Sequence, residues 1–498
     1  MQKPGRVLDR DDEWATLMSF VAHRDPHLRI AVVAGRRRVG KSFLLRGLLE
    51  VSGGLYVTAV AEEDAPAARR RLATTIARYA GVAPDLVADA DWEQLITSAV
   101  DLVVQRQGGN GLVVIDELPY WLAHSPQIEG LLQLIYDRSR AGDGAPGGRL
   151  VLCGSALSVM DTLLSGRKAL RGRAAVDLRL RPFDLRTSAS HWEIPDGEAA
   201  LYLYATLGGA AGHRDLSPVG APRSADEFDD WVCHTVLAPG QALFSRTETE
   251  YLLREDPKFT GSVLHYAILR AVAAGATSPA KIGSLIERDR TALARPLEAL
   301  VDAGYLRYDR DPLWQRRPVI TVADQIVRFH NLVTVPQNDL VEANRTSEAW
   351  AAARPTFQSR ILGPQFEECA RDWVRRYGPG EAGLRIGTIA AATVNDKAGN
   401  ARHELDVISL IGTEVALLGE AKATVGPVGI AELDRLDHIG TLLAEEGRAV
   451  PRAVRALFSL RGFRADLVRA ARTRGDVLLV DLSALLGSAP PKVTPEPL

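Results

Sequence analysis

The segment from Gly35 to Ser42 reads Gly-Arg-Arg-Arg-Val-Gly-Lys-Ser and matches the pattern G-x-x-x-x-G-K-[ST]. An apolar run, Ala31–Ala34, comes directly before it, and a stretch typical of a helix, Phe43–Glu50, comes directly after it. This order constrains the fold strongly, because the motif works as a phosphate cradle only between a strand and a helix. The glycines let successive backbone N–H groups face one point, and the helix adds its positive dipole end. The sequence therefore predicts a phosphate-binding loop.

Residue types within this loop indicate a nucleoside triphosphate as its ligand. Lys41 is long enough to reach the β- and γ-phosphates, and the Ser42 hydroxyl can bind Mg²⁺. We therefore expect ATP and Mg²⁺ to bind here. The three arginines between the two glycines are unusual, and they either contact phosphate or lie in solvent. The expected binding residues are Gly35, Arg36, Arg37, Arg38, Val39, Gly40, Lys41 and Ser42.

Acidic residues follow an apolar run that reads as a strand, Leu112–Ile115. Because Asp116 would lie at the tip of that strand, it suits the shell of the Mg²⁺ ion, and Glu117 suits the activation of an attacking water. The next expected strand is followed by Ser155, which either senses the γ-phosphate or caps a helix. Arg173 follows a glycine before the last expected strand, and it either supplies charge to the transition state or is a solvated arginine.

Short apolar runs alternate with amphipathic stretches between Arg29 and Leu185. Strands separated by helices of this length predict βαβ units and a parallel sheet. Pro182 follows the last run, and the mixed helices and Gly-rich loops of residues 195–257 indicate a lid on that sheet. The expected strands are Ile30–Ala34, Leu55–Val60, Leu112–Ile115, Leu150–Cys153 and Val176–Leu180.

The segment 258–333 reads as three short helices followed by a hairpin. This order is typical of a winged helix-turn-helix, so the segment predicts that fold. Its 11 basic and 7 acidic residues give a net charge of +4, whereas the whole chain carries −2. The expected helices are Val263–Ala273, Ser278–Ile286 and Arg288–Ala303, and the expected strands are Tyr305–Tyr308 and Val319–Val322.

Three arginines, Arg288, Arg290 and Arg295, lie on or at the start of the third helix, which would be the recognition helix. Basic residues there can bind the phosphate backbone of duplex DNA. Acidic neighbours dilute this charge, however, and winged helices also serve as internal packing modules. DNA contact and internal packing therefore both stay open as interpretations.

Charged side chains recur in the C-terminal part of the chain, which again alternates strands with helices. Glu367 lies on an expected helix, Phe366–Tyr377, and Asp406 lies within an expected strand. Glu420 and Lys422 end the next strand, and because strand side chains alternate between faces, both point the same way. The expected strands are Leu384–Ile389, Leu405–Leu410, Val415–Ala421, Val454–Leu460 and Val477–Leu482, with a helix over Ile430–Leu443.

A carboxylate on one strand and E-x-K on its neighbour is the arrangement of PD-(D/E)xK nucleases. We expect Asp406, Glu420 and Glu367 to converge on Mg²⁺, which would lower the pKa of a bound water and stabilise the phosphoryl oxyanion. Lys422 would position that water. Only eight of the 60 basic residues are lysines, so a lysine kept at this position favours a specific role. The alternative is a surface pair of Glu420 and Lys422.

Composition excludes several classes of protein. The apolar fraction of 46% and the charged fraction of 24% are those of globular proteins, which excludes a fibrous or disordered chain. No run approaches the roughly 18 apolar residues of a membrane span. The N-terminal residues lack the apolar core of a signal peptide, and the three cysteines form no metal or disulfide spacing. We therefore expect a cytoplasmic protein with no membrane partner.

The motifs in their order resemble the archaeal-type ATPases of the P-loop AAA+/STAND kind, which also occur in bacteria. Besides the Walker A loop, this group has Asp-Glu after the third strand, Gly-Ser after the fourth, and Gly-Arg before a strand that ends in Pro-Phe. Asp116–Glu117, Gly154–Ser155 and Gly172–Arg173 match these motifs. The early F-x-x-R-x-x-E pattern is met only approximately, with Leu8 in place of Phe. The resemblance implies that Arg10 lies near the base of the nucleotide.

The resemblance extends through the rest of the chain, because such ATPases recur with a winged helix and a restriction-endonuclease-like domain. The motifs of that domain are here Phe366–Glu367, Glu404–Asp406 and Gly419–Lys422. This architecture implies an ATPase that acts on DNA and carries a metal-dependent nuclease domain. The alternatives are a nucleotide-dependent DNA-binding regulator whose nuclease fold is a scaffold, and a STAND-like signalling switch with a protein partner. The sequence leaves open whether the chain forms a homo-oligomer.

Together these observations predict an α/β multidomain protein: a P-loop NTPase parallel sheet with a helical lid, a winged helix-turn-helix, and a C-terminal restriction-endonuclease-like α/β domain. The expected boundaries are 1–190 for the ATPase core, 191–257 for the lid, 258–335 for the winged helix, 336–355 for a linker, 356–486 for the nuclease-like domain, and 487–498 for a Pro-rich, disordered tail.

Overall fold

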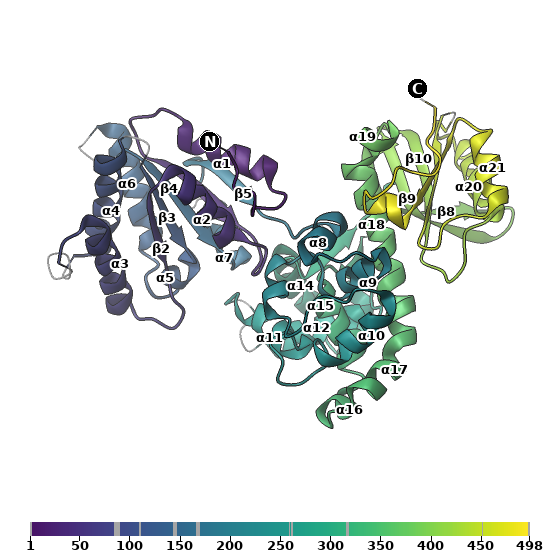
Figure 1. Ribbon diagram of the computed structural model, residues 1–498, viewed down its shortest axis with the longest axis horizontal. Helices are drawn as coiled ribbons and strands as arrows, with labels where there is room; N and C mark the ends of the chain where they lie inside the picture. Colours follow the sequence, from purple (N-terminus) through teal and green to yellow (C-terminus); the bar gives the residue numbers. More distant parts are fainter. Residues whose placement is uncertain are drawn as a thin grey trace. The chain divides into compact units, whose positions relative to one another are not determined.

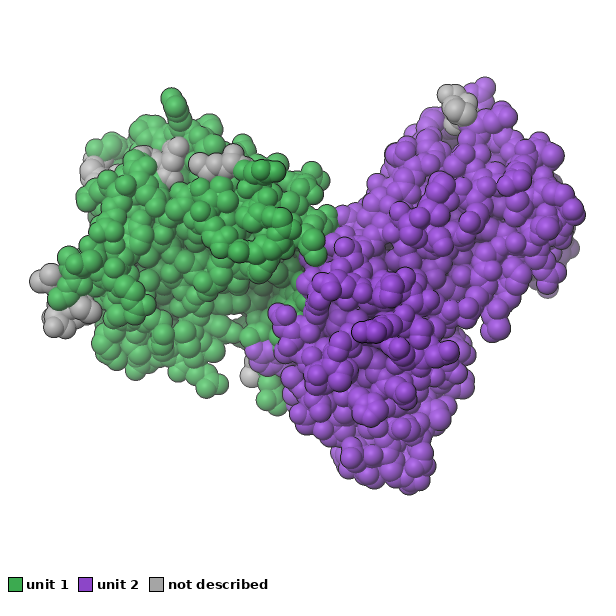
Figure 2. Space-filling model, in the orientation of Figure 1, with its two compact units in different colours: residues 1–182, 210–212, 252–261 green, residues 183–209, 213–251, 262–498 purple. Residues whose placement is uncertain are grey.

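The computed structural model describes residues 2–83, 90–108, 111–142, 147–165, 170–257, 259, 262–314, 318–450 and 452–496 (Figure 1). The chain divides into two compact units (Figure 2). Unit 1 comprises residues 1–182, 210–212 and 252–261, and unit 2 comprises residues 183–209, 213–251 and 262–498. Within the described ranges no helix is both long and apolar enough to cross a bilayer.

A five-stranded sheet forms the centre of unit 1. Its strands are β1 (Arg29–Ala34), β2 (Leu55–Thr58), β3 (Leu112–Asp116), β4 (Arg149–Gly154) and β5 (Ala174–Arg179). They lie in the order β2-β3-β4-β1-β5, and every neighbouring pair is parallel. The predicted parallel α/β sheet is therefore confirmed, with strand ends within a few residues of the expected ones.

Helices cover both faces of this sheet (Figure 1). They are α1 (Asp11–Ala22), α2 (Lys41–Ser52), α3 (Ala65–Ala80), α4 (Trp92–Gln107), α5 (Leu118–His124), α6 (Ile128–Ala141) and α7 (Leu157–Leu164). Alternate residues of β1 enter different cores: Ile30 and Val32 pack with α3, α4 and α6, whereas Ala31 and Val33 pack with α1 and α2. This burial on both faces explains why the strands read as continuous apolar runs.

Unit 2 begins with a bundle of helices. They are α8 (Leu185–Trp192), α9 (Gly197–Leu207), α10 (Ala225–His234), α11 (Ser245–Arg254), α15 (Gln325–Phe329), α16 (Asn338–Glu342) and α17 (Thr346–Thr356). The last three residues of α11, 252–254, are assigned to unit 1. The expected linker of residues 336–355 is thus mostly helical. Its alanines and arginines favour a helix, and the helix runs on through a π-helical turn, Phe357–Leu362, into α18 (Gly363–Arg376).

Three helices and a hairpin occupy the segment where a winged helix-turn-helix is expected. They are α12 (Val263–Ala273), α13 (Pro279–Leu285), α14 (Ala294–Asp302), β6 (Leu306–Asp309) and β7 (Val319–Val322), and the two strands are antiparallel. The third helix begins later than the expected Arg288. A 3₁₀ turn, Arg290–Leu293, precedes α14, because the Asp289 side chain accepts a hydrogen bond from the Thr291 N–H at 2.7 Å and caps that turn.

A second five-stranded sheet ends the chain. Its strands are β8 (Thr388–Asp396), β9 (Ala401–Ile411), β10 (Glu414–Lys422), β11 (Val454–Ser459) and β12 (Val477–Asp481), in the order β12-β11-β10-β9-β8. The pairs β8–β9 and β9–β10 are antiparallel, whereas β10–β11 and β11–β12 are parallel. The flanking helices are α18, α19 (Gly378–Ala382), α20 (Ile430–Glu445), α21 (Ala465–Arg472) and α22 (Leu482–Leu485). The first strand begins at Thr388, four residues later than expected.

The predicted disorder of the C-terminal tail is wrong for its described part, residues 487–496. Leu479 of β12 donates its N–H to Val493 at 3.0 Å and accepts one from Lys492 at 2.8 Å. The Glu496 N–H is bonded to Gly475 at 2.9 Å. Because β12 is the edge strand of its sheet, the tail pairs with backbone groups that would otherwise be exposed.

Candidate functional site

The glycine-rich loop of unit 1 joins β1 to α2, as the sequence predicts. Gly40 adopts φ 92°, a left-handed conformation that favours glycine, and it caps α2. Gly35 has no room for a side chain, because a Cβ would lie 2.8 Å from the Leu180 carbonyl oxygen. Lys41 is 5% exposed, and its Nζ donates to the carbonyl oxygens of Gly35 at 2.7 Å and Arg36 at 3.1 Å. The ammonium is therefore held directly over the loop.

The two side chains expected to bind Mg²⁺ lie in contact. The Ser42 hydroxyl donates to Asp116 Oδ2 at 2.6 Å, and Asp116 is 2% exposed. Tyr56 donates its hydroxyl to the same carboxylate oxygen. Burial, and then the charge of Asp116, raise the pKa of the Tyr56 phenol well above its ordinary value, so the phenol keeps its proton. Tyr56 was missed by sequence reasoning, because only the register of β2 beside β3 brings it there.

Glu117, the expected activator of water, is bound to Ser155. The Ser155 hydroxyl donates to Glu117 Oε2 at 2.6 Å. Glu117 adopts φ 56° and caps α5, so the turn after β3 directs its side chain toward the end of β4. The alternative role of Ser155 as a helix cap is wrong, because the residue at the cap of α7 is Ala156. Ser155 therefore joins the end of β4 to the Glu117 carboxylate.

A further carboxylate, Glu255, reaches this site from far along the chain. It accepts hydrogen bonds from Ser155 and, at 3.1 Å, from Arg37 Nη1. Burial raises its pKa, and the Ser155 hydrogen bond and the Arg37 charge oppose that rise. Its neighbour Asp256 accepts from the Ser158 hydroxyl at 2.7 Å and from the Ser158 N–H at 3.2 Å. Sequence reasoning placed this segment in the lid, although the adjacent Glu-Asp pair was a signal.

Arg10 contacts the same loop. It is 6% exposed, and its Nη2 donates to the carbonyl oxygens of Arg181 at 2.7 Å and Val39 at 3.3 Å. These bonds link the start of α1 to the loop and to the end of β5. The guanidinium therefore braces the loop from within unit 1.

Arg173 is not brought to the loop. It precedes β5, where Ala174 pairs with Ile30 at the start of β1, whereas the loop follows the opposite end of β1. Its Nε and Nη2 each donate to a carboxylate oxygen of Asp137 at 2.9 Å. The transition-state role expected for Arg173 therefore has no support in the geometry of this chain's own site.

In unit 2 the pairing of β9 with β10 brings Asp406 and Glu420 together. Gly419 pairs with Val407, so the next positions along the two strands are these two carboxylates. Asp406 Oδ2 accepts the N–H of Ala421 at 2.8 Å. Lys422 Nζ lies 2.5 Å from Glu420 Oε1. These three charged side chains therefore lie beside one another on β9 and β10.

Burial and neighbouring charges shift the pKa values of the ionisable side chains around this strand pair. Burial and then the charge of Glu420 raise the pKa of Asp406 to about 6. Burial and then the charge of Asp406 raise the pKa of Glu367, on α18, to about 7. Burial opposes the charge on Lys422, but its bond to Glu420 prevails and raises the pKa of the ammonium.

Among the described residues, Glu367, Asp406 and Glu420 do not bring three ligand atoms within 4.8 Å of one another. In the described part of the chain, the group whose three ligand atoms all lie within 4.8 Å of one another comprises other residues. Glu420 instead pairs with Lys422 and with Arg435 of α20, and its side chain is 5% exposed. Such cationic partners stabilise a buried carboxylate in the absence of metal. Arg435 was missed because it lies on a separate helix.

The arginines expected on a recognition helix are all exposed, but α14 itself carries only one of them. Arg288 and Arg290 precede the helix, and Arg295 lies in its first turn. The opposite face of α14 is buried through Leu297 and Leu300.

Comparison with solved structures finds likenesses to ATPases. The Walker-type ATPase of Pyrococcus abyssi is 19% identical, with 66% of this chain and 97% of that chain covered at a TM-score of 0.49. The Aeropyrum pernix ORC2 protein in its ADPNP-ADP complexes is 17% identical, with 69% and 96% covered at 0.44. A STAND protein with a tetratricopeptide repeat sensor from Pyrococcus horikoshii is 12% identical, with 75% and 50% covered at 0.30. No family model and no curated protein matches the chain. Because these TM-scores are below 0.5, the likenesses carry no conclusion about function, and the proposals below rest on the geometry of this chain.

Proposed function

We propose that unit 1 binds ATP with Mg²⁺ and hydrolyses it. The observation that carries this proposal is the contact between the Ser42 hydroxyl and the Asp116 carboxylate, beside a buried Lys41 on the loop. Hydroxyl and carboxylate oxygens are ligands that Mg²⁺ accepts, and it usually keeps several waters as well. Mg²⁺ would neutralise charge that develops on the phosphate oxygens. The amides of the loop and Lys41 would hold the phosphates.

Glu117 provides the chemical step in this proposal, because its carboxylate can accept a proton from the attacking water. The Ser155 bond holds that carboxylate and would release it when a γ-phosphate competes for the hydroxyl. Glu117 bound to Ser155 would thus correspond to a resting state, and Glu117 released from Ser155 would correspond to a state that is active in hydrolysis.

Replacing Glu117 with glutamine is expected to keep ATP binding and to lower kcat for ATP hydrolysis by about a hundredfold or more, the usual worth of a general base. The substitution keeps the shape of the side chain and removes only its basicity. The measurement is phosphate release at saturating ATP, with nucleotide affinity determined in parallel. An exposed glutamate between β2 and α3, Glu62→Gln, is the matched control. Equal turnover in Glu117→Gln and the wild type would rule out this role.

We propose DNA as the partner of unit 2 and metal-dependent cleavage of DNA as its second activity. The arrangement α12–α13–α14–β6–β7 supports DNA binding, because it presents Arg288, Arg290 and Arg295 at the surface. The neighbouring positions of Asp406 on β9 and Glu420 on β10 support a cation site, because a divalent ion would relieve the repulsion between such carboxylates. A non-catalytic regulator would use the same arginines without the carboxylates.

Replacing Arg288, Arg290 and Arg295 with alanine is expected to weaken DNA binding and to flatten its dependence on salt. Each lost phosphate contact lowers the slope of log affinity against log salt by about 0.9. The measurement is fluorescence anisotropy of a labelled duplex at several salt concentrations. Exposed arginines of α3, Arg70 and Arg78, provide the control substitutions. An unchanged slope with intact binding would move the contact elsewhere and favour internal packing of this segment.

A further inference from the structure

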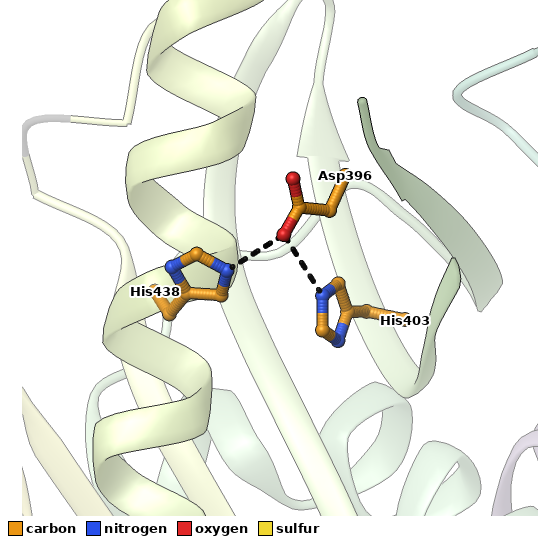
Figure 3. Close-up of side chains that lie close together, drawn as sticks. All are labelled: Asp396, His403 and His438. Atoms are coloured by element: carbon orange, nitrogen blue, oxygen red, sulfur yellow. Dashed lines mark ion pairs between the residues drawn. The ribbon is translucent and has the colours of Figure 1, made fainter. Parts of the chain in front are cut away.

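Three side chains that no activity above employs lie together beside the turn between β8 and β9 (Figure 3). Asp396 ends β8, His403 lies on β9, and His438 lies on α20. One ligand atom from each lies within 4.8 Å of the other two. We propose that these three side chains bind a divalent transition-metal ion, and that Zn²⁺ is the ion that fits them best.

The separations between the ligand atoms are compatible with an ion site, and one of them is too long for a hydrogen bond. Asp396 Oδ2 lies 3.4 Å from His438 Nε2 and 3.9 Å from His403 Nε2. The longer separation exceeds any hydrogen bond between nitrogen and oxygen. Ligand atoms placed about 2.0–2.1 Å from a tetrahedral ion are about 3.4 Å from each other. The three atoms therefore surround a space that a Zn²⁺ ion fills with small side-chain movements.

His403 provides an independent observation. Its Nε2 is buried, and it has no hydrogen-bond partner among the residues that the structure describes. A nitrogen removed from water without a partner costs free energy. Figure 3 shows both imidazoles directed at the same carboxylate oxygen, and their ring centres lie 5.4 Å apart in an edge-to-face arrangement. A bound ion would satisfy this nitrogen and join the two rings.

The carboxylate is held in place by the turn behind it. Asp396 Oδ1 accepts the N–H of Gly399 at 2.7 Å, which leaves Oδ2 to face the imidazoles. Such outer bonds orient the ligands of metal sites. Gly399 is also the residue that leaves space for the carboxylate, because a Cβ there would lie 2.5 Å from Oδ2. The side chain of His438 is 50% exposed, so water can reach the site and supply a fourth ligand.

The donor set selects the metal. Imidazole nitrogen suits Zn²⁺ and its neighbours in the first transition row, whereas Mg²⁺ takes oxygen ligands. The site is thus chemically distinct from the carboxylates at Asp406 and Glu420. A bound ion would tie the β8–β9 hairpin to α20, the helix whose Arg435 pairs with Glu420. Zn²⁺ would therefore stabilise the helix that borders the proposed cleavage site.

The test uses the full chain, freed of metal by a chelator and titrated with ZnCl₂. We expect one Zn²⁺ per chain by calorimetry and by elemental analysis, and loss of that binding in His438→Ala and Asp396→Asn. His438 is largely exposed, so its replacement leaves the core intact. The control is His234→Ala, an exposed histidine of α10 that should leave the stoichiometry unchanged. MgCl₂ at the same concentration should produce no saturable binding that depends on His438.

A second variant keeps all three ligands. Gly399→Ala should weaken Zn²⁺ binding at least tenfold, because the added methyl group displaces the carboxylate. Zn²⁺ should also raise the melting temperature of the wild type but not that of His438→Ala. Absence of binding to the wild type, or binding that survives both ligand substitutions, would overturn the proposal and leave an Asp–His ion-pair cluster.

Discussion

Replacing Lys41 with alanine is expected to abolish ATP binding, and with it all ATP hydrolysis. The ammonium is the compact positive charge of the loop, and it lies buried over the Gly35 and Arg36 carbonyl oxygens. The β- and γ-phosphates would replace those carbonyls as its partners. The loop also contains Arg36, Arg37 and Arg38, but a planar guanidinium on a different stem does not reproduce a point charge at this position. The measurement is calorimetric titration of the full chain with ATP and Mg²⁺.

Lys41→Met serves beside the alanine variant, because it keeps the apolar stem and tests the charge alone. Lys281→Ala, an exposed lysine of α13, is the control and should bind ATP like the wild type. Circular dichroism melting curves of each variant check that the loop change leaves unit 1 folded. ATP affinity in Lys41→Met within twofold of the wild type would contradict the proposed site.

The sheet of unit 1 could be predicted because its signals are local. Apolar runs, a glycine-rich loop and acidic residues after a strand are each read within a few residues, and parallel strands bring their carboxyl ends to one edge. Ser42 and Asp116 are therefore in contact at 2.6 Å although 74 positions apart in sequence. Each of these residues lies beside a strand end, where the fold leaves it little freedom.

Contacts that depend on distant segments could not be predicted in the same way. Glu255 reaches the loop because residues 252–261 return to unit 1 after the chain has entered unit 2, and no local pattern encodes that return. Arg435 reaches Glu420 only because α20 packs against β10 and the neighbouring strand β11. The tail pairs with β12 because an edge strand has backbone N–H and C=O groups left over for an extended segment. The prolines of the tail therefore gave a misleading signal of disorder.

Rotamers also lie beyond sequence reasoning. The strand register of Asp406 and Glu420 follows from alternation, but the direction of the Glu420 carboxylate depends on competition between cations. In the structure, the Glu420 carboxylate pairs with Lys422 and Arg435. A metal ion bound by both Asp406 and Glu420 would have to displace Lys422 or Arg435 from the Glu420 carboxylate. The proposed cleavage would therefore depend on these two cations as well as on the carboxylates.

Replacing Asp406 with alanine is expected to abolish Mg²⁺- or Mn²⁺-dependent cleavage of DNA while ATP hydrolysis stays intact. Asp406 lies beside Glu420 on neighbouring strands, and its loss removes an oxygen ligand from the proposed cation site. The proposed ATP hydrolysis should be unaffected, because the phosphate loop belongs to unit 1 and Asp406 to unit 2. The measurement is cleavage of plasmid, linear and single-stranded DNA, with and without ATP. The control is Asp434→Ala, an exposed carboxylate of α20.

Lys422→Arg separates a catalytic role from a surface ion pair. Arginine would preserve the pair with Glu420, so a purely structural lysine would tolerate the change. A lysine that positions water next to a metal would not, because the planar guanidinium lacks the compact ammonium charge. We therefore expect Lys422→Arg to remain folded, with an unchanged melting temperature, and to lose cleavage as Asp406→Ala does. If both Asp406→Ala and Lys422→Arg cleaved DNA like the wild type, the carboxylates of unit 2 would have no catalytic role. That result would favour the alternative of a DNA-binding regulator whose C-terminal domain is a scaffold.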